Sequence, residues 1–225
     1  MNTAIIVAAG SGKRFTAEQP KQFVPLLGKP LIIHTLERFD SCPSIDEIVL
    51  VLSKEGVHVF SQISGQFEIV KIRSIVTGGK TRAESVRNGL DAVDGSRSNI
   101  VAVHDGARPL VSIREIARTV ETAAESGAAC LVAEVTDTIK EIVGERILRT
   151  VDRRTLRRAL TPQAFRYDIL RKAFAGIDLS ESINDECYLV EKLGVKISVV
   201  EGNARNIKIT RPEDLVLAEA FLRNV

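Results

Sequence analysis

A glycine-rich, strongly basic segment near the start of the chain has the residues to bind an anion. The sequence Ala8-Ala9-Gly10-Ser11-Gly12-Lys13-Arg14 comes directly after a short apolar run, and Lys21 follows it. Glycines let a backbone approach a ligand with its N–H groups exposed, and the cations add positive charge. The sequence therefore predicts a phosphate-binding loop, with an ordinary surface turn carrying solvated cations as the alternative.

This loop departs from two common phosphate-binding motifs. The dinucleotide fingerprint G-x-G-x-x-G needs a third glycine where Phe15 stands. The P-loop would need glycine at Val7 and a hydroxyl side chain at Arg14. What remains is a glycine loop flanked by Lys13, Arg14 and Lys21, a set of charges suited to a polyphosphate.

A carboxylate farther along the chain could hold a metal ion beside that polyphosphate. Asp105 ends an apolar run and is followed by Gly106 and then by Arg108. Mg²⁺ takes one or two protein carboxylates and fills its octahedron with phosphate oxygens and water, so Asp105 is a candidate ligand. An ion pair between Asp105 and Arg108 across a turn is the alternative. His104, alone at a strand end, is expected to be a hydrogen-bonded structural residue rather than a base.

Other polar groups stand where further elements begin or end. The segment from Gly78 to Ser85 offers backbone amides and hydroxyls at a helix start, which suits a phosphate or the polar edge of a base. Capping of that helix by Thr81 is the alternative. By itself, Lys208 is only a strand lysine. Polar and basic residues also stand at both ends of a predicted hairpin, where most such side chains are solvated: Thr138, Lys140, Arg153 and Arg154.

The elements that must position these residues alternate between strands and helices. Apolar runs predict strands at 3–7, 47–52, 68–76, 99–103, 128–135, 196–200 and 206–209. Helical spacing predicts helices at 31–39, 57–63, 81–93, 113–126, 167–174 and 186–193, and Thr210-Arg211-Pro212-Glu213 has the pattern of a capping box that opens a last helix. This order predicts an α/β fold with a mostly parallel sheet, helices on both faces and a ligand site at the carboxyl ends of the strands.

A change of pattern after the fifth predicted strand indicates an arm. Apolar and charged residues alternate around Gly144, which predicts a β-hairpin inserted at about 137–155. We expect this arm to rest on a partner subunit, with a solvent-facing ribbon as the alternative. No linker, repeat or low-complexity stretch is present, so residues 1–225 are expected to form a single domain.

The composition limits the classes of function. The chain has 225 residues, of which 31 are basic and 29 acidic, and its net charge of +2 gives no global field that would favour bulk nucleic-acid binding. Three scattered cysteines without metal-ligand spacing favour a reducing compartment. No signal peptide and no run of about 18 apolar residues stands out. A cytoplasmic protein that binds neither nucleic acid nor membrane is therefore expected.

A series of short blocks carries a family resemblance. They lie at 8–14, 20–23, 27–30, 78–86, 103–109, 137–140, 160–163 and 206–210. In this order they resemble the 2-C-methyl-D-erythritol 4-phosphate cytidylyltransferases, from residue 4 to about 220. The first block is shared by sugar nucleotidyltransferases at large, whereas several later blocks are specific to this family. The resemblance implies a three-layer, Rossmann-like nucleotidyltransferase fold and a homodimer joined by exchanged β-arms.

The resemblance also implies the reaction and the roles of the site residues. The family transfers CMP from CTP to methylerythritol phosphate, with Mg²⁺, in the non-mevalonate route of isoprene biosynthesis. By matching position, the contacts to CTP are Ala8, Ala9, Gly10, Gly12, Gly79, Lys80, Ser85 and Asp105. Arg14, Lys21 and Lys208 match catalytic cations at the phosphates, and Asp105 matches the metal ligand. The residues near the sugar phosphate match Arg108, Thr138, Arg153 and Thr161, of which Thr138 and Arg153 would serve the neighbouring subunit.

Two positions depart from the family pattern, and three competing functions stay open. Lys80 stands where relatives often have an acidic residue, so its contact to the base is expected through the backbone, and Asn184 replaces a threonine that could supply a hydroxyl. A cytidylyltransferase for another polyol phosphate, such as ribitol 5-phosphate, would share the loop, the aspartate and the lysines. The second competing function is a sugar-1-phosphate nucleotidyltransferase that uses UTP or dTTP, and the third is a non-catalytic nucleotide sensor.

Overall fold

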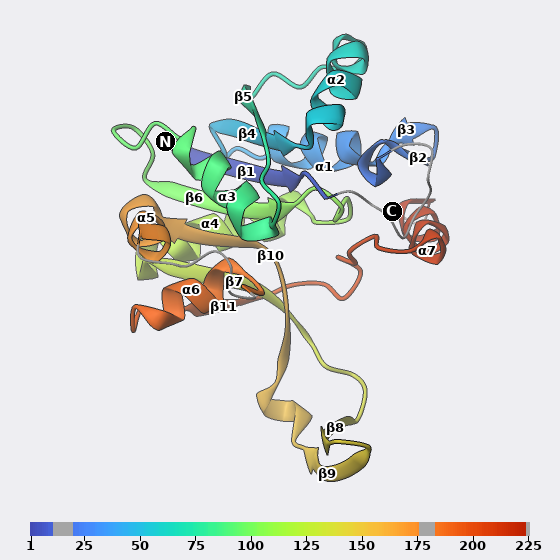
Figure 1. The fold of residues 1–225 in the computed structure, drawn as a ribbon, viewed down its shortest axis with the longest axis vertical. Coiled ribbons are helices and arrows are strands. Elements are labelled where there is room, and N and C mark those ends of the chain that lie inside the picture. Colours follow the sequence, from blue (N-terminus) through green and yellow to red (C-terminus); the bar gives the residue numbers. More distant parts are fainter. Residues whose placement is uncertain (11–19, 176–182, 224–225) are drawn as a thin grey trace.

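A twisted seven-stranded sheet forms the centre of the molecule in the computed structural model, which describes residues 1–10, 20–175 and 183–223 (Figure 1). The strand order is β11-β7-β10-β6-β1-β4-β5. The strands are β1 (Asn2–Ala8), β4 (Glu47–Leu52), β5 (Ile72–Thr77), β6 (Ile100–Asp105), β7 (Ala128–Glu134), β10 (Arg157–Arg166) and β11 (Ser198–Glu201). Because β1 pairs in parallel with both β4 and β6, and β4 with β5, the carboxyl ends of four strands meet at one edge.

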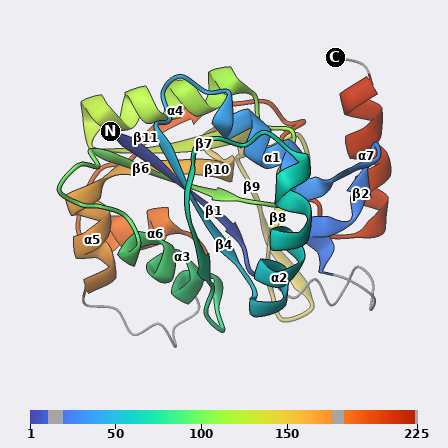
Figure 2. The same ribbon diagram turned by 90° about the horizontal axis from the view of Figure 1, so that it is seen from above.

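Helices cover both faces of this sheet. The helices are α1 (Leu31–Asp40), α2 (Lys54–Ile63), α3 (Arg82–Asp91), α4 (Ile113–Ser126), α5 (Tyr167–Ala175), α6 (Glu186–Lys192) and α7 (Pro212–Arg223). Alternate residues of β1 point to opposite faces: Ala4 and Ile6 pack in one core with α1, α2 and α4, and Ile5 packs in the other with α3, α5 and α6. In Figure 2, α4 lies on one side of the sheet and α3, α5 and α6 on the other. The predicted three-layer α/β class is thus observed.

The strand β10 lies in the middle of the sheet and was not predicted. It runs antiparallel between β6 and β7, in an otherwise parallel sheet. Its sequence begins with two arginines and contains Pro162, and proline is normally confined to edge strands because it cannot donate to the ladder. The segment therefore lacks the apolar run that identified the other strands, although six consecutive residues within it are buried.

The predicted strand at 206–209 is wrong. These residues are extended but form no ladder, and Ile209 N donates to the Ala107 carbonyl at 2.8 Å. Lys208 therefore projects from an extended segment beside the sheet. The predicted capping box is also corrected: Asp214, rather than Glu213, accepts from Thr210 N, Thr210 Oγ1 and Arg211 N. Pro212 opens α7 as expected.

Two short hairpins lie outside the main sheet. The first joins β2 (Pro25–Leu26) to β3 (Lys29–Pro30), next to α7. The second joins β8 (Ile139–Val143) to β9 (Arg146–Val151) and projects far from the body of the molecule, at the bottom of Figure 1. Its apolar side chains Ile142, Val143, Ile147 and Leu148 are each about 60% exposed. The predicted hairpin is thus present and protrudes. Among the described residues, no helix is long and apolar enough to cross a membrane.

Candidate active site

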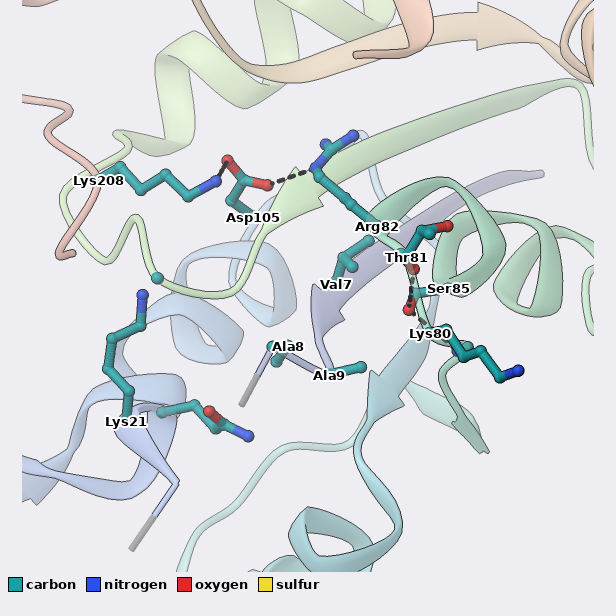
Figure 3. Close-up of a pocket in the computed structure, with 14 residues that line it drawn as sticks. Val7, Ala8, Ala9, Lys21, Lys80, Thr81, Arg82, Ser85, Asp105 and Lys208 are labelled. Atoms are coloured by element: carbon teal, nitrogen blue, oxygen red, sulfur yellow. Dashed lines mark hydrogen bonds and ion pairs between the residues drawn. The ribbon is translucent and has the colours of Figure 1, made fainter. Parts of the chain in front are cut away.

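A cavity of about 390 Å³ opens at the carboxyl ends of β1 and β6 and at the loop that follows β5 (Figure 3). Its lining comes from segments distant in the sequence, and comprises Val7, Ala8, Ala9, Gly10, Lys21, Gln22, Gly79, Lys80, Thr81, Arg82, Ser85, Asp105, Ala107 and Lys208. The structure thus brings together most of the nucleotide-site residues expected from the sequence. Gly12 and Arg14 lie outside the described residues.

The two glycine loops, after β1 and after β5, contact each other at the edge of the cavity. A Cβ on Gly78 would lie 2.3 Å from the Cβ of Ala9, so that only glycine allows this approach. In the second loop, Gly79 N donates to Ser85 Oγ at 3.1 Å, and Ser85 Oγ donates to the Thr81 carbonyl at 2.9 Å. These contacts fix the amides and the hydroxyl that line the cavity.

Helix capping and cavity lining occur together in the second loop. Thr81 Oγ1 accepts from Glu84 N, and the Glu84 carboxylate accepts from Thr81 N at 3.4 Å, which completes a capping box at the start of α3. The same carboxylate accepts from Lys80 N at 2.6 Å. The capping alternative is therefore correct for Thr81, without excluding a ligand role for its neighbours. The Lys80 side chain points away from Asp105 in Figure 3.

Two lysines enter the cavity from separate segments. Lys21 belongs to a short 3₁₀ turn, Lys21–Phe23, and its Nζ donates to the Ile209 carbonyl at 2.7 Å. Lys208 precedes that residue, and its Nζ lies 3.0 Å from Oδ2 of Asp105. The hydrogen bond from Lys21 therefore joins its 3₁₀ turn to the extended segment that carries Lys208.

Asp105 is the charged centre of the site. Oδ1 accepts from Arg82 Nε at 3.0 Å, while Oδ2 lies 3.3 Å from Arg108 Nε and 3.0 Å from Lys208 Nζ. Burial by itself would raise the pKa of Asp105, but the charges of Arg82, Lys208 and Arg108 outweigh it and hold the pKa well below its usual range. Asp105 is therefore ionised, and the ion pair with Arg108 expected as an alternative is present.

Thr161 and His104 lie beneath Asp105 rather than in the lining. Thr161 Oγ1 accepts from Asp105 N at 3.1 Å and lies 3.0 Å from His104 Nδ1. The threonine hydroxyl then donates to Nδ1, so that Nε2 carries the ring proton and donates to the Arg108 carbonyl at 3.1 Å. His104 is completely buried, and its role is structural, as the sequence predicts.

The buried His104 should make stability depend on pH. Burial lowers its pKa to about 3, whereas the unfolded chain titrates near about 6.5. The unfolded state thus binds the proton first, so this contribution to the free energy of unfolding is present above about pH 6.5 and is lost as pH falls toward 3. Denaturant unfolding at several pH values measures how the free energy of unfolding changes with pH. In His104→Gln this slope should be flatter than in wild type, by up to about 1.4 kcal/mol per pH unit.

The exposed His58 provides the control for that measurement. His58→Gln should keep the wild-type dependence of unfolding free energy on pH. An unchanged slope in His104→Gln would contradict a neutral buried His104.

The residues expected near the sugar phosphate are divided between two places. Arg108 is mostly buried and binds Asp105 and the Asn206 carbonyl, the latter at 2.8 Å from Nη1. Arg153, at the end of the arm, donates to the Thr136 carbonyl, and Thr138 lies just before β8. Among the described residues that line the cavity, none comes from the arm.

Arg82 and Glu186 were not predicted. Arg82 lies within the second glycine loop, which drew attention only to its amides and hydroxyls. Its guanidinium makes two hydrogen bonds to the buried Glu186, at 2.6 and 3.0 Å, besides the one to Asp105. The two residues are 104 positions apart, and nothing in their spacing signals the contact. Only the topology that places the start of α6 beside the start of α3 reveals it.

A mostly parallel sheet whose carboxyl edge carries two glycine loops, two lysines and one ionised aspartate fits the class of nucleotidyltransferases. Enzymes of this class generally use a divalent metal ion. The family model described as 2-C-methyl-D-erythritol 4-phosphate cytidylyltransferase matches residues 2–224. The chain belongs to this family of cytidylyltransferases.

Individual members of the family match this sequence over nearly its whole length. An enzyme of that name from Syntrophus aciditrophicus is 42% identical over 228 residues, covering 98% of this chain and 95% of the relative. One from Bacillus velezensis is 43% identical over 221 residues, with 97% and 94% covered.

Solved structures agree with this assignment. The 4-diphosphocytidyl-2C-methyl-D-erythritol synthase of Anaerococcus prevotii superposes with a TM-score of 0.87 at 30% identity, over 99% of this chain and 96% of the other. The 2-C-methyl-D-erythritol 4-phosphate cytidylyltransferase of Thermus thermophilus gives 0.76 at 35% identity, with 98% of both chains covered. The predicted nucleotidyltransferase fold and the family resemblance are confirmed.

Proposed function

We propose that the cavity binds CTP with Mg²⁺ and that the enzyme transfers CMP to 2-C-methyl-D-erythritol 4-phosphate. The products are 4-diphosphocytidyl-2-C-methyl-D-erythritol and pyrophosphate. Within the family, the observation that carries this proposal is the convergence of Lys21, Lys208 and Asp105 on one cavity beside the two glycine loops. The reaction belongs to the non-mevalonate route of isoprene biosynthesis.

The attacking group needs no general base. A phosphate monoester has its second pKa near about 6, so at neutral pH the acceptor is largely a dianion. His104 is buried and neutral, and it is structural. The protein must instead align the attacking oxygen with the α-phosphorus and neutralise the charge that develops toward pyrophosphate.

The chain's cations supply that neutralisation. Lys21 and Lys208 enter the cavity from separate segments, and Lys208 is proposed to bind the α-phosphate. Arg14, outside the described residues, is proposed to act with Lys21 on the departing pyrophosphate. The backbone of Ala8, Ala9, Gly10 and Gly12 would contact the nucleotide, and Gly79, Lys80 and Ser85 would frame cytosine.

Asp105 fits the role of a protein ligand for Mg²⁺ only in company with a triphosphate. Among the described residues, no group of three or more His, Cys, Asp or Glu side chains could hold a metal ion. Mg²⁺ commonly binds one carboxylate plus substrate phosphates, which matches a lone aspartate at a polyphosphate cavity. The ion, when bound, withdraws negative charge from the phosphate oxygens. When CTP binds, the Lys208 ammonium would move from Oδ2 of Asp105 to the α-phosphate of the nucleotide.

The acceptor site is proposed to include residues of two subunits. Arg108 and Thr161 lie next to Asp105 within one chain, whereas Thr138 and Arg153 lie on the protruding arm. We propose a homodimer in which each arm, with its exposed apolar residues, packs on the partner and brings Thr138 and Arg153 to the partner's cavity. The exposure of these apolar side chains in one chain supports the proposal, because isolated ribbons are only marginally stable in water and packing on a partner would bury them.

Mixed dimers test the exchange of arms. Lys21→Ala inactivates the cavity of its own chain, and Arg153→Ala would inactivate the cavity of the partner. In a heterodimer of the two variants, one cavity then has both defects and the other has none. Equimolar mixing with subunit exchange should therefore restore about one quarter of the wild-type activity. Activity that stays at the level of the unmixed variants would contradict shared sites.

An acceptor panel tests the reaction. Pyrophosphate release is expected with CTP, Mg²⁺ and 2-C-methyl-D-erythritol 4-phosphate, and at most slowly with ribitol 5-phosphate. Faster release with ribitol 5-phosphate would assign a different polyol cytidylyltransferase, and UTP or dTTP with sugar 1-phosphates tests the remaining enzyme class. Binding of CTP without release of pyrophosphate under any of these conditions would assign a nucleotide sensor.

Domain organisation and cellular location are part of the same proposal. Residues 1–225 are proposed to form one nucleotidyltransferase domain with the arm as an insertion, supported by the family match over 2–224. A cytoplasmic location is proposed because Cys42, Cys130 and Cys187 are buried free thiols, which suits a reducing compartment.

A further inference from the structure

An ion pair between Arg82, which lines the cavity, and the buried Glu186 has no assigned ligand role in the proposed reaction. Glu186 is completely buried, and its two oxygens accept from Nη1 and Nη2 of Arg82 at 2.6 and 3.0 Å. The Nε of the same guanidinium donates to Oδ1 of Asp105 at 3.0 Å (Figure 3). One planar side chain therefore joins the two carboxylates in a fixed geometry, which a lysine could not reproduce.

Glu186 is itself held firmly in place. It begins α6, and Gln163 Oε1 on the central strand β10 accepts from the backbone N–H groups of Glu186 and Cys187, both at 3.1 Å. The Gln163 side chain also donates to Asp185 at 3.0 Å, and Asp185 caps α6 by accepting from Tyr188 N. The position of the Glu186 carboxylate is thus set by the sheet.

The two oxygens of Asp105 differ in their surroundings. Oδ1 binds Arg82, which the buried Glu186 holds, whereas one partner of Oδ2 is Lys208, whose side chain is 39% exposed on an extended segment. The Lys208 ammonium can leave Asp105 to bind a phosphate of the nucleotide, but Arg82 cannot leave without abandoning a buried carboxylate. Oδ2 keeps its contact with Arg108 Nε at 3.3 Å, and the departure of Lys208 frees a second position on this oxygen. In this sense Oδ2 is the exchangeable oxygen.

Resting on the proposed function, we propose that Glu186 acts through Arg82 as a positioning residue, which holds the Asp105 carboxylate in the orientation that would receive the metal ion arriving with the triphosphate. Glu186 neither contacts the nucleotide nor binds the metal. Its effect is on the metal-dependent part of CTP binding. Groups that orient a metal ligand commonly change metal affinity by about 10- to 100-fold when they are removed.

Calorimetric titration of CTP into the intact enzyme tests this role, once with Mg²⁺ and once with EDTA. In Glu186→Gln, the dissociation constant for CTP with Mg²⁺ should rise by about tenfold or more, while the constant in EDTA stays within about twofold of wild type. Arg82→Lys should behave in the same way, and the double variant should be no worse than either single variant, because the two residues act as a unit.

Matched controls separate positioning from structural damage. Glu191→Gln makes the same chemical change on the exposed side of α6, and Arg87→Lys does so on the exposed side of α3; both should bind CTP like wild type with and without Mg²⁺. Unchanged Mg²⁺-dependent binding in Glu186→Gln or in Arg82→Lys would overturn the proposal. Equal weakening with and without the metal would also overturn it, because that indicates a displaced helix.

Failure of the proposed function would be recognised separately. If wild type binds CTP no better with Mg²⁺ than with EDTA, Asp105 does not hold a metal beside the nucleotide, and both proposals are overturned. That result appears in wild type, whereas failure of the positioning role alone appears only in the variants. If Glu186→Gln does not fold, Arg82→Lys, which keeps a cation next to both carboxylates, decides the outcome.

Discussion

Replacing Lys21 with alanine should lower kcat for pyrophosphate release by about 10²- to 10³-fold, because one preorganised charge contact to the transition state contributes about 2 to 4 kcal/mol. Lys21 lines the cavity and approaches it beside Lys208. Because the proposed nucleophile is already ionised, the barrier depends on how well the cations neutralise the departing pyrophosphate. Arg14→Ala should lower kcat by a similar factor.

Folding should be far less sensitive to this substitution. The alanine removes the hydrogen bond from Nζ to the Ile209 carbonyl, which corresponds to about 1 kcal/mol of unfolding free energy. Lys29→Ala is the matched control, since Lys29 forms an ion pair with Glu37 outside the cavity and should keep wild-type kcat. Near-wild-type turnover in purified Lys21→Ala and Arg14→Ala would rule out the proposed mechanism.

Asp105→Asn should have the largest effect on stability, besides abolishing metal-dependent CTP binding. The substitution keeps the shape of the side chain but leaves Arg82, Arg108 and Lys208 around a neutral amide in a buried site. Removing one partner from a buried ionic cluster lowers the free energy of unfolding by about 3 kcal/mol or more. Urea unfolding at pH 7 measures this difference directly, and little or no difference would show that the three cations find other partners.

The pH dependence gives a second measure of the same cluster. Because the folded pKa of Asp105 is lowered, the unfolded state binds the proton first as pH falls. The stabilisation by the Asp105 charge is therefore complete above the ordinary aspartate pKa, about 3.9, and is lost as pH falls from there toward the lowered folded value. The difference in the free energy of unfolding between wild type and Asp105→Asn should therefore decrease as pH falls over that range. Asp91→Asn, which breaks an exposed ion pair with Arg171, should change stability by at most about 1 kcal/mol.

Local sequence pattern was sufficient for the elements that obey one rule along their whole length. After Glu47, strand β4 is an uninterrupted apolar run, and α4 has apolar residues at helical spacing between a serine cap and Gly127. Strand β10 obeys no single rule. Its first three residues, where the chain leaves the arm, are exposed, whereas the next six are buried in the sheet. The segment at 206–209 has strand-like alternation, but it forms no ladder with any strand in the described part of the chain.

The candidate site shows the same division. Ala8 to Gly10 and Gly79 could be predicted because glycine and small residues after a strand have few other uses, and Asp105 because a carboxylate ends an apolar run. Arg82 and Glu186 could not, because an arginine and a glutamate on helix surfaces are ordinary, and only the packing of α6 against the rest of the molecule buries their pair. Long-range ion pairs depend on topology, which local periodicity does not contain.

The course of β10 has a mechanical consequence for the arm. The second leg of the hairpin continues through a short 3₁₀ turn, Arg153–Thr155, directly into β10, without a flexible linker between them. β10 then pairs with β6, and Thr161 within it holds the backbone of Asp105. Arm and aspartate are thus joined by one strand and one hydrogen bond, although the register of β10 shifts between Ala159 and Gln163. We expect a displacement of the arm to reach the backbone of Asp105 through this strand.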